Sequence, residues 1–193
     1  MMALAPEPRA AEPLPGPNDP CCDEAELIRT TVAGDTRAFE TLVHAHHRRV
    51  YNFLAQMTRH HHDAEDLTQQ TFIKAFHHLG RFDRQRPLIN WLLTIARNSA
   101  LNHFRDVKKW EEMPFEPAGH EPTPARSAEQ KEQTENLWAR ARALLSSREF
   151  EVLWLRFAEE MSTRDTARIV GLTETHVKVL VFRARAALMA KKE

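Results

Sequence analysis

The segment 173–185 places basic and hydroxyl side chains on one side of an expected helix. Lys178, Arg183 and Arg185 carry positive charges that can neutralise phosphate groups. Thr173 stands at the start of the segment, where its hydroxyl can cap the first backbone N–H groups. The residues expected on the outer side of this helix are Glu174, Thr175, Lys178, Val179, Phe182 and Arg183.

A short amphipathic segment, 162–170, comes directly before this helix and supplies a partner for it. Ala167, Ile169 and Val170 form its apolar side, and Gly171 follows where a tight turn needs a permissive backbone. The second helix would then bury Val177, Leu180, Val181, Ala184 and Leu188. This arrangement is typical of a DNA-binding helix-turn-helix, whose second helix enters the major groove. An ordinary helical hairpin is the alternative, and the combined features favour DNA binding.

A second candidate surface for nucleic acid follows Pro87, which suits the first turn of a helix. One stripe of this helix consists of Trp91, Leu92, Ile95, Ala96 and Ser99. The other stripe consists of Thr94, Arg97, Asn98, Leu101, Asn102 and Arg105. Arg and Asn side chains pair well with phosphates and base edges. Taken alone, however, a solvated face of an amphipathic helix is the better interpretation of this stripe.

The loop before that helix also has a composition suited to nucleic acid. Arg81, Arg84 and Arg86 surround Phe82 and Gln85. Basic side chains near an aromatic ring can hold an unstacked base. The pattern is too common to decide the function by itself.

The charges alternate along the chain although the 27 basic and 27 acidic residues cancel. Residues 1–79 carry 7 basic and 11 acidic side chains, a balance of −4, and residues 80–109 carry 7 and 2, a balance of +5. Residues 110–135 carry 2 and 7, or −5, and residues 136–193 carry 11 and 7, or +4. Chance is one explanation for such short blocks. Two segments that face nucleic acid, with acidic surfaces that meet a basic partner, are the other.

The sequence predicts an all-α fold of two small helical domains joined by a flexible linker. Glycine is scarce, helix-forming residues abound, and no strand-like alternation of useful length occurs. Four ranges are expected: a disordered tail over 1–22, a four-helix domain over 23–107, an acidic proline-rich linker over 108–130 and a helix-turn-helix domain over 131–193. No apolar run is long enough for a membrane span.

Glycine and capping residues predict the helix boundaries of the first domain. Gly34-Asp35 should break a short opening helix, with Asp35 capping the next one. The run His60–His62 should end the second helix, and Asp63 should cap the third. Gly80 is placed to stop that third helix.

In the second domain, serines and aromatic residues mark the helix starts and the core. Ser146 and Ser162 each begin a capping-box pattern, completed by Glu149 and Asp165. The aromatic residues expected in the core are Trp138, Phe150, Trp154 and Phe157.

Histidine and cysteine side chains raise the question of a metal site. His44 and His47 lie one helical turn apart, His60–His62 and His77-His78 form two further groups, and Cys21-Cys22 are adjacent. Neighbouring histidines on a helix point in different directions, so we expect a solvated surface and no metal or other cofactor. An adjacent cysteine pair is a poor disulfide and fits a reducing cytoplasm. No phosphate-binding glycine loop or nucleophile beside a base predicts catalysis.

Three stretches together resemble the extracytoplasmic-function (ECF) group of bacterial RNA polymerase sigma factors. They are DAEDLTQQTFIKAF at 63–76, WLLTIARN at 91–98, and the series SREFEVLWLRF…S…GL…HVK…FRARAAL over 147–188. Parts of each stretch are common in other proteins. All three stretches in this order, with a loose linker between them, are specific to this group. The resemblance covers nearly all of residues 24–190.

The resemblance implies a transcription initiation subunit that binds core RNA polymerase, at its clamp helices and flap, and promoter DNA. The residues implied in polymerase docking are Asp63, Glu65, Asp66, Gln69 and Phe72. Those implied in melting and reading the −10 element are Arg81, Arg84, Arg86, Arg97, Asn98, Asn102 and Arg105. Those implied in reading the −35 element are Thr173, Thr175, His176, Lys178, Val179, Phe182 and Arg183. The acidic linker would lie in the RNA path of the polymerase, and an anti-sigma factor would be a further partner.

Three positions depart from the pattern of the ECF group. Thr166 replaces a large aliphatic residue, Val179-Leu180 stand where Ser and Arg are frequent, and Asn102 stands where an acidic residue is common. The second departure removes a phosphate contact and suggests an unusual −35 sequence or a weaker hold on the DNA. The fold is unaffected.

Two other functions remain open at this level. One is a stand-alone helix-turn-helix regulator, with residues 24–107 as a sensor or dimerisation domain. The other is a protein-interaction adaptor or metal sensor that uses the acidic helix and the histidines. Dependence on core polymerase separates the first from a sigma factor, and a metal titration tests the second.

Overall fold

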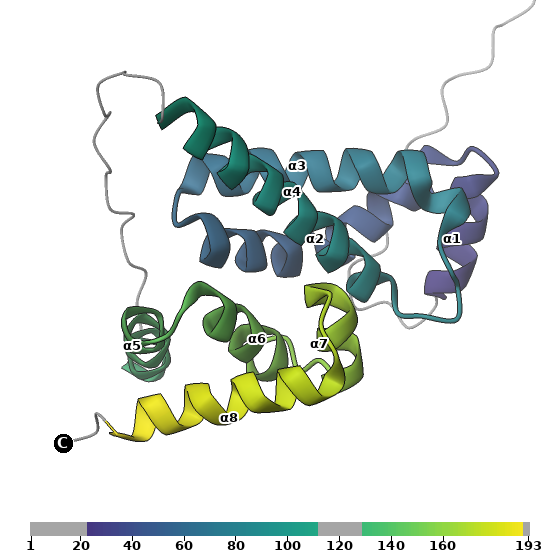
Figure 1. Ribbon diagram of the computed structural model, residues 1–193. Helices are drawn as coiled ribbons and strands as arrows, with labels where there is room; N and C mark the ends of the chain where they lie inside the picture. Colours follow the sequence, from purple (N-terminus) through teal and green to yellow (C-terminus); the bar gives the residue numbers. More distant parts are fainter. Residues whose placement is uncertain (1–22, 112–128, 191–193) are drawn as a thin grey trace, which may run out of the picture. The chain divides into compact units, whose positions relative to one another are not determined.

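The computed structural model describes residues 23–111 and 129–190, whose regular structure is entirely helical (Figure 1). The helices are α1 (Glu24–Val32), α2 (Thr36–Thr58), α3 (His61–His78), the 3-10 turn η1 (Leu79–Arg81), α4 (Leu88–Glu111), α5 (Glu129–Leu144), α6 (Ser147–Phe157), α7 (Thr163–Val170) and α8 (Glu174–Ala190). The predicted all-α class is confirmed. The expected tail, Cys21-Cys22 and most of the expected linker lie outside the described residues.

The chain divides into two compact units, Met1–Ala45 and His46–Glu193. The boundaries expected from the sequence, 23–107 and 131–193, therefore stay a prediction. Within the described ranges, every helix is too short or too polar to span a bilayer.

The first unit contains α1 and the start of α2, and it has the predicted break. The Asp23 carboxylate accepts the N–H of Ala25 at 3.1 Å and caps α1. Gly34 takes a φ of 107°, a conformation that glycine adopts without steric cost. The Asp35 carboxylate then accepts the N–H of Arg37 at 2.9 Å, which confirms its predicted capping role.

The histidine run opens α3 instead of ending α2, so two boundary predictions were wrong. α2 ends at Thr58, because Arg59 takes a φ of 61° and turns the backbone out of the helical path. His60 is the N-cap of α3, and its Nδ1 accepts the N–H of Asp63 at 3.4 Å. An imidazole nitrogen with a free lone pair thus serves as the acceptor that a capping Asp or Asn would supply. Asp63 lies in the first turn.

α3 and α4 pack against each other and form the core next to the candidate sites (Figure 1). The buried side of α3 consists of Ala64, Leu67, Thr68, Thr71, Phe72 and Ala75. The buried apolar residues of α4 are Leu88, Ile89, Leu92, Leu93, Ala96 and Ala100. Each fully buried leucine stabilises the fold by roughly 2 kcal/mol. α3 ends at His78, two residues before the predicted stop at Gly80, and η1 leads into the loop before α4.

In the C-terminal part, α5, α6 and α8 share an apolar cluster. Its buried members are Ala141, Leu145, Phe150, Leu153 and Ala184, with Trp138 and Trp154 packed against them. The Trp138 and Trp154 ring centroids lie 4.8 Å apart. Phe157 is 50% exposed at the last residue of α6, so its predicted place in the core was wrong.

The predicted helix-turn-helix is present as α7, a three-residue turn and α8. Gly171 ends α7 in the left-handed region at φ 68°, and the Leu172 N–H bonds the Ala167 carbonyl at 2.9 Å. The Thr173 hydroxyl accepts the N–H of His176 at 3.3 Å and caps α8, as predicted. The hydroxyls of Ser146 and Ser162 also cap α6 and α7 as expected.

Thr166 of α7 is fully buried, and within the described ranges its hydroxyl has no hydrogen-bond partner. A buried, unpaired hydroxyl costs stability, and valine has nearly the same shape without it. We therefore expect Thr166→Val to raise the free energy of unfolding by about 1 kcal/mol in urea titrations.

Thr68→Val is the matched control, because Thr68 is equally buried but its hydroxyl donates to the Ala64 carbonyl at 2.6 Å. This variant loses a hydrogen bond and should not gain stability. Equal effects of the two substitutions would show that the Thr166 hydroxyl is not a source of instability.

Candidate nucleic-acid interface

The outer face of α8 is open to solvent along its length. All seven residues expected to read the −35 element are exposed: Thr173, Thr175, His176, Lys178, Val179, Phe182 and Arg183. Val177, Leu180 and Ala184 are buried on the opposite side, while Val181 and Leu188 are only half-buried. The helix-turn-helix packing thus leaves one polar and basic surface available on the second helix.

A groove of about 550 Å³ runs beside this face, between the start of α7 and the later turns of α8. Phe182 and Met189 on its rim are 74% and 70% exposed, which is unusual for large apolar side chains. Arg156 and Arg185 add positive charge to the same groove. The surface is therefore partly apolar as well as basic.

A second groove, of about 490 Å³, lies between α3 and α4 and brings together three predicted −10 residues, Arg81, Asn98 and Asn102. The other residues that line it are Lys74, His78, Trp91, Ile95 and Ser99. The Lys74 ammonium donates to the Ser99 hydroxyl at 2.8 Å. The hollow combines cations, amides and an indole ring, the groups that bind an unstacked base.

Lys74 and His78 were not predicted as members of this groove, although the sequence contains a signal for them. Lys74, His78 and Arg81 are spaced by four and three residues, which places successive residues on one side of a helix. Because that periodicity continues from α3 into η1, it would have predicted that Arg81 lies on the same side as Lys74 and His78.

Two arginines of the loop before α4, Arg84 and Arg86, do not line the groove. Arg84 and Arg86 are exposed, and Arg86 pairs with Asp83 at 3.0 Å. Phe82 is only 8% exposed and packs against Trp91, with ring centroids 5.2 Å apart. Phe82 therefore supports the loop instead of offering a free ring to a base.

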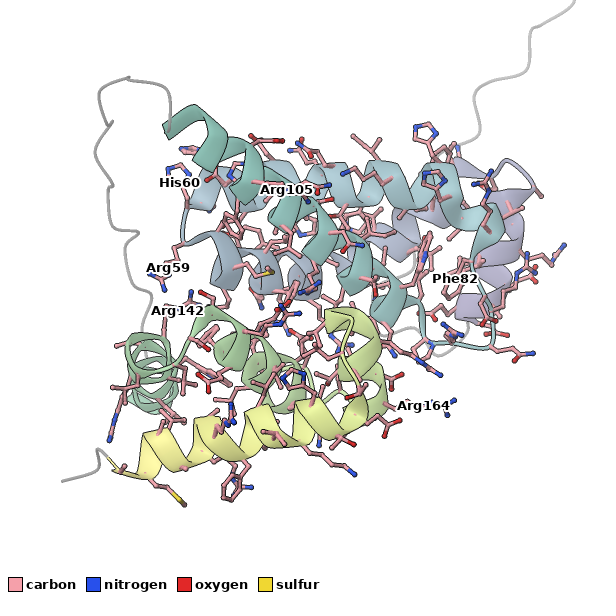
Figure 2. The ribbon with its side chains drawn as sticks, viewed as in Figure 1. Arg59, His60, Phe82, Arg105, Arg142 and Arg164 are labelled. Carbon is pink, nitrogen blue, oxygen red and sulfur yellow. The ribbon has the colours of Figure 1, made fainter. Side chains whose placement is uncertain are left out.

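Two arginines of α4 have different surroundings. Arg105 is exposed on α4 (Figure 2). It donates to the amide oxygen of Asn102, which lines the groove, at 2.7 Å. Arg97 is 8% exposed, and its guanidinium bonds the carboxylate of Glu151 on α6 at 2.5 Å. The expectation that Arg97 lies on the exposed stripe with Asn98 was wrong, because this ion pair buries it. Contact with DNA would require Glu151 to release it.

The residues expected to dock on polymerase lie on α3, and one of them is not accessible. Glu65, Asp66 and Gln69 are exposed and Asp63 is half-buried. Phe72 is 6% exposed and stacks on His47, with ring centroids 6.2 Å apart. Phe72 therefore has a packing role, and its ring is not available for direct contact with the polymerase.

The exposed surface of α3 includes two large apolar residues that were not among the predicted docking residues. Ile73 is 58% and Phe76 41% exposed. With Asp66 and Gln69 they follow the offsets 0, 3, 7 and 10 of one helical face. An apolar strip bordered by acids is typical of a protein-binding surface.

The histidines do not assemble a metal centre in the described part of the chain. No group of three His, Cys, Asp or Glu side chains there is placed to hold a metal ion. Cys21-Cys22 lie outside the described residues.

Family models match both parts of the sequence that carry these surfaces. Residues 42–111 match Sigma-70 region 2, which includes α3, α4 and their groove. Residues 137–188 match Sigma-70, region 4, which includes α7 and most of α8.

The chain is also similar to whole sigma factors. It is 31% identical over 146 residues to the ECF RNA polymerase sigma factor SigM of Bacillus subtilis, covering 73% of this chain and 86% of that protein. SigM of Mycobacterium tuberculosis is 32% identical over 167 residues, with coverages of 86% and 82%. BldN of Streptomyces coelicolor is 30% identical over 82% of this chain, which spans 62% of the length of BldN.

Two solved structures share the fold. CnrH in complex with the cytosolic domain of CnrY has a TM-score of 0.62 and 25% identity, covering 86% of this chain and 95% of that one. RpoE in complex with the anti-sigma factor NepR from Bartonella quintana has a TM-score of 0.61 and 25% identity, with coverages of 80% and 98%. The chain therefore belongs to the ECF group of RNA polymerase sigma factors, which direct the polymerase to promoters and catalyse no reaction themselves.

Proposed function

We propose that this chain binds core RNA polymerase through α3 and places two DNA-binding surfaces on one promoter, where it starts transcription. One observation carries the proposal: a groove suited to an unstacked base and an exposed helix-turn-helix face occur in segments that match regions 2 and 4. A stand-alone repressor would need only the second of these surfaces.

The −35 element would be read by α8 in the major groove of duplex DNA. The exposed hydroxyl and imidazole groups near its start, on Thr173, Thr175 and His176, can bond base edges. Lys178 and Arg183 would neutralise phosphates. Val179 and Phe182 would contribute apolar contacts, for which the methyl group of thymine is a suitable partner.

The −10 element would be read as a single strand by the groove between α3 and α4. A base flipped out of the duplex can stack on Trp91 while the amides of Asn98 and Asn102 bond its edges. Lys74 and Arg81 would hold the flanking phosphates, with Arg84, Arg86 and Arg105 nearby. Unstacking costs a few kcal/mol, which these contacts offset without ATP.

Docking on polymerase would use the acidic and apolar face of α3. Glu65, Asp66 and Gln69 offer acceptors to a basic partner, and Ile73 and Phe76 extend the contact with apolar area. Asp63 would contribute from the first turn. Phe72 would hold this face in place from inside.

The remaining features of the proposal concern organisation and control. We place the two domains at residues 23–107 and 131–193, with the acidic linker, 108–130, in the RNA path of the polymerase. The protein would act in the cytoplasm, where the polymerase is found. The solved relatives RpoE and CnrH are held in complexes with NepR and CnrY, which supports an anti-sigma factor as a partner of this chain too.

We expect Arg183→Ala to weaken binding of the polymerase complex to promoters and to reduce the slope of log affinity against log salt by about 1. The physical reason is the loss of one phosphate contact and its released counterion. Fluorescence anisotropy over a salt series measures both quantities. Arg37→Ala, which removes an exposed charge in the first unit, is the control and should leave the slope unchanged. An unaltered slope for Arg183→Ala would exclude the phosphate contact.

We expect Asn98→Ala to slow formation of the open complex about tenfold and to leave closed-complex affinity nearly unchanged, because the groove acts only on an unstacked base. Permanganate reactivity of thymines in the −10 element follows opening over time. Asn90→Ala is the matched control, since Asn90 lies on the same helix outside the groove. Equal losses in closed and open complexes would contradict a melting role for Asn98.

A further inference from the structure

Four histidines surround the two carboxylates at the start of α3. His60, His61 and His62 come from the first turn and its cap, and His103 comes from α4. His60 marks this end of α3, next to Arg59 (Figure 2). The carboxylates, Asp63 and Glu65, belong to the face that the proposed function assigns to polymerase docking.

Two imidazoles approach Asp63 from different elements. The Oδ2 atom of Asp63 lies 3.4 Å from Nε2 of His103 and 3.6 Å from Nδ1 of His60. The three side chains are 30%, 36% and 47% exposed for His103, Asp63 and His60, so solvent protons reach all of them.

Glu65 has a similar pair of neighbours. Its Oε1 lies 3.2 Å from Nε2 of His61, and its Oε2 lies 4.0 Å from Nδ1 of His62. The other nitrogen of His61 lies 2.7 Å from the hydroxyl of Tyr51 on α2. Burial, followed by the charge of Glu65, raises the pKa of Tyr51, so this phenol stays neutral in the physiological range.

Protonation of the histidines would reverse the charge of this surface. Asp63, Glu65 and Asp66 together carry −3, and four protonated imidazoles would add +4, which leaves +1. Histidine is the side chain that normally changes charge between about pH 5 and pH 8. From α2 come Arg59 and Tyr51, and His47 stacks on Tyr51 with ring centroids 6.4 Å apart; α4 also carries Arg105 and Asp106. Apart from His47, none of these groups ordinarily changes charge in that interval.

The N-cap of α3 also depends on the protonation state of His60. Nδ1 of His60 accepts the N–H of Asp63, and it can do so only while that nitrogen carries no proton. Protonation removes the acceptor and places a positive charge at the positive end of the helix dipole. Both changes loosen the turn that holds Asp63 and Glu65.

We propose that these histidines make polymerase docking pH-dependent: the acidic face of α3 is available to the polymerase when the imidazoles are neutral and is masked when they are protonated. The inference rests on the proposed function of α3. At high pH the carboxylates are free to meet a basic surface. At low pH Asp63 and Glu65 pair with their own histidines, and the surface, now with a net positive charge, repels a basic partner.

The test compares the affinity of the full-length chain for core RNA polymerase at about pH 6 and about pH 8. We expect the wild-type chain to bind about tenfold more weakly at the lower pH. The test variant combines His60→Asn, His61→Gln, His62→Gln and His103→Gln, and its asparagine keeps a capping acceptor that does not titrate. The affinity ratio of this variant between the two pH values should fall to about twofold or less.

His44→Gln is the matched control, because this exposed histidine of α2 also lies near a carboxylate, 3.9 Å from Glu40, but is outside the proposed docking face, and it should keep the wild-type ratio. All chains are measured with the same polymerase preparation, so any pH dependence of the polymerase itself affects every ratio equally. Circular dichroism at both pH values checks that each chain stays folded. Equal affinity ratios for the wild-type chain and the variant with four substitutions would overturn the proposed pH switch but not the docking proposal. A wild-type chain that binds polymerase at neither pH would overturn the docking proposal and the switch with it.

Discussion

The packing of α3 against α4 determines most of the surfaces to which a function is assigned. Leu67 and Ala75 on one helix, and Leu92 and Ala96 on the other, are buried almost completely. Because a helical residue that points inward fixes the direction of its neighbours, this packing turns Asp66 and Gln69 outward. The same contact forms the groove that contains Lys74 and Asn98, and it brings His103 to Asp63.

Polar contacts then fix the positions of side chains that the apolar packing leaves exposed. Lys74 is held to Ser99 and Arg105 to Asn102, so the groove has defined edges before any ligand binds. Such preorganisation lowers the cost of ordering side chains on binding. In the C-terminal part, the left-handed conformation of Gly171 has the comparable role, since it sets the turn from which α8 presents its outer face.

Much of this organisation follows from the sequence, because helix periodicity and caps are local signals. The all-α class, the helix-turn-helix and the caps at Asp35, Ser146 and Thr173 were predicted correctly. Two of the errors arose where tertiary contacts decide. The burial of Arg97 depends on Glu151, 54 residues away, and that of Phe72 on a stack with His47. A third error was local: the role of His60 as a cap depends on the positive φ of Arg59, which residues other than glycine rarely adopt.

The central claim is that both DNA-binding surfaces work only when the polymerase carries them. Run-off transcription over a library of promoters, with purified core enzyme and with or without this chain, tests the claim most directly. The account predicts discrete transcripts from a subset of templates that require both components and share paired −10 and −35 sequences. It would be contradicted by a chain that starts no transcript with core enzyme, or that binds its promoter DNA equally well without the polymerase.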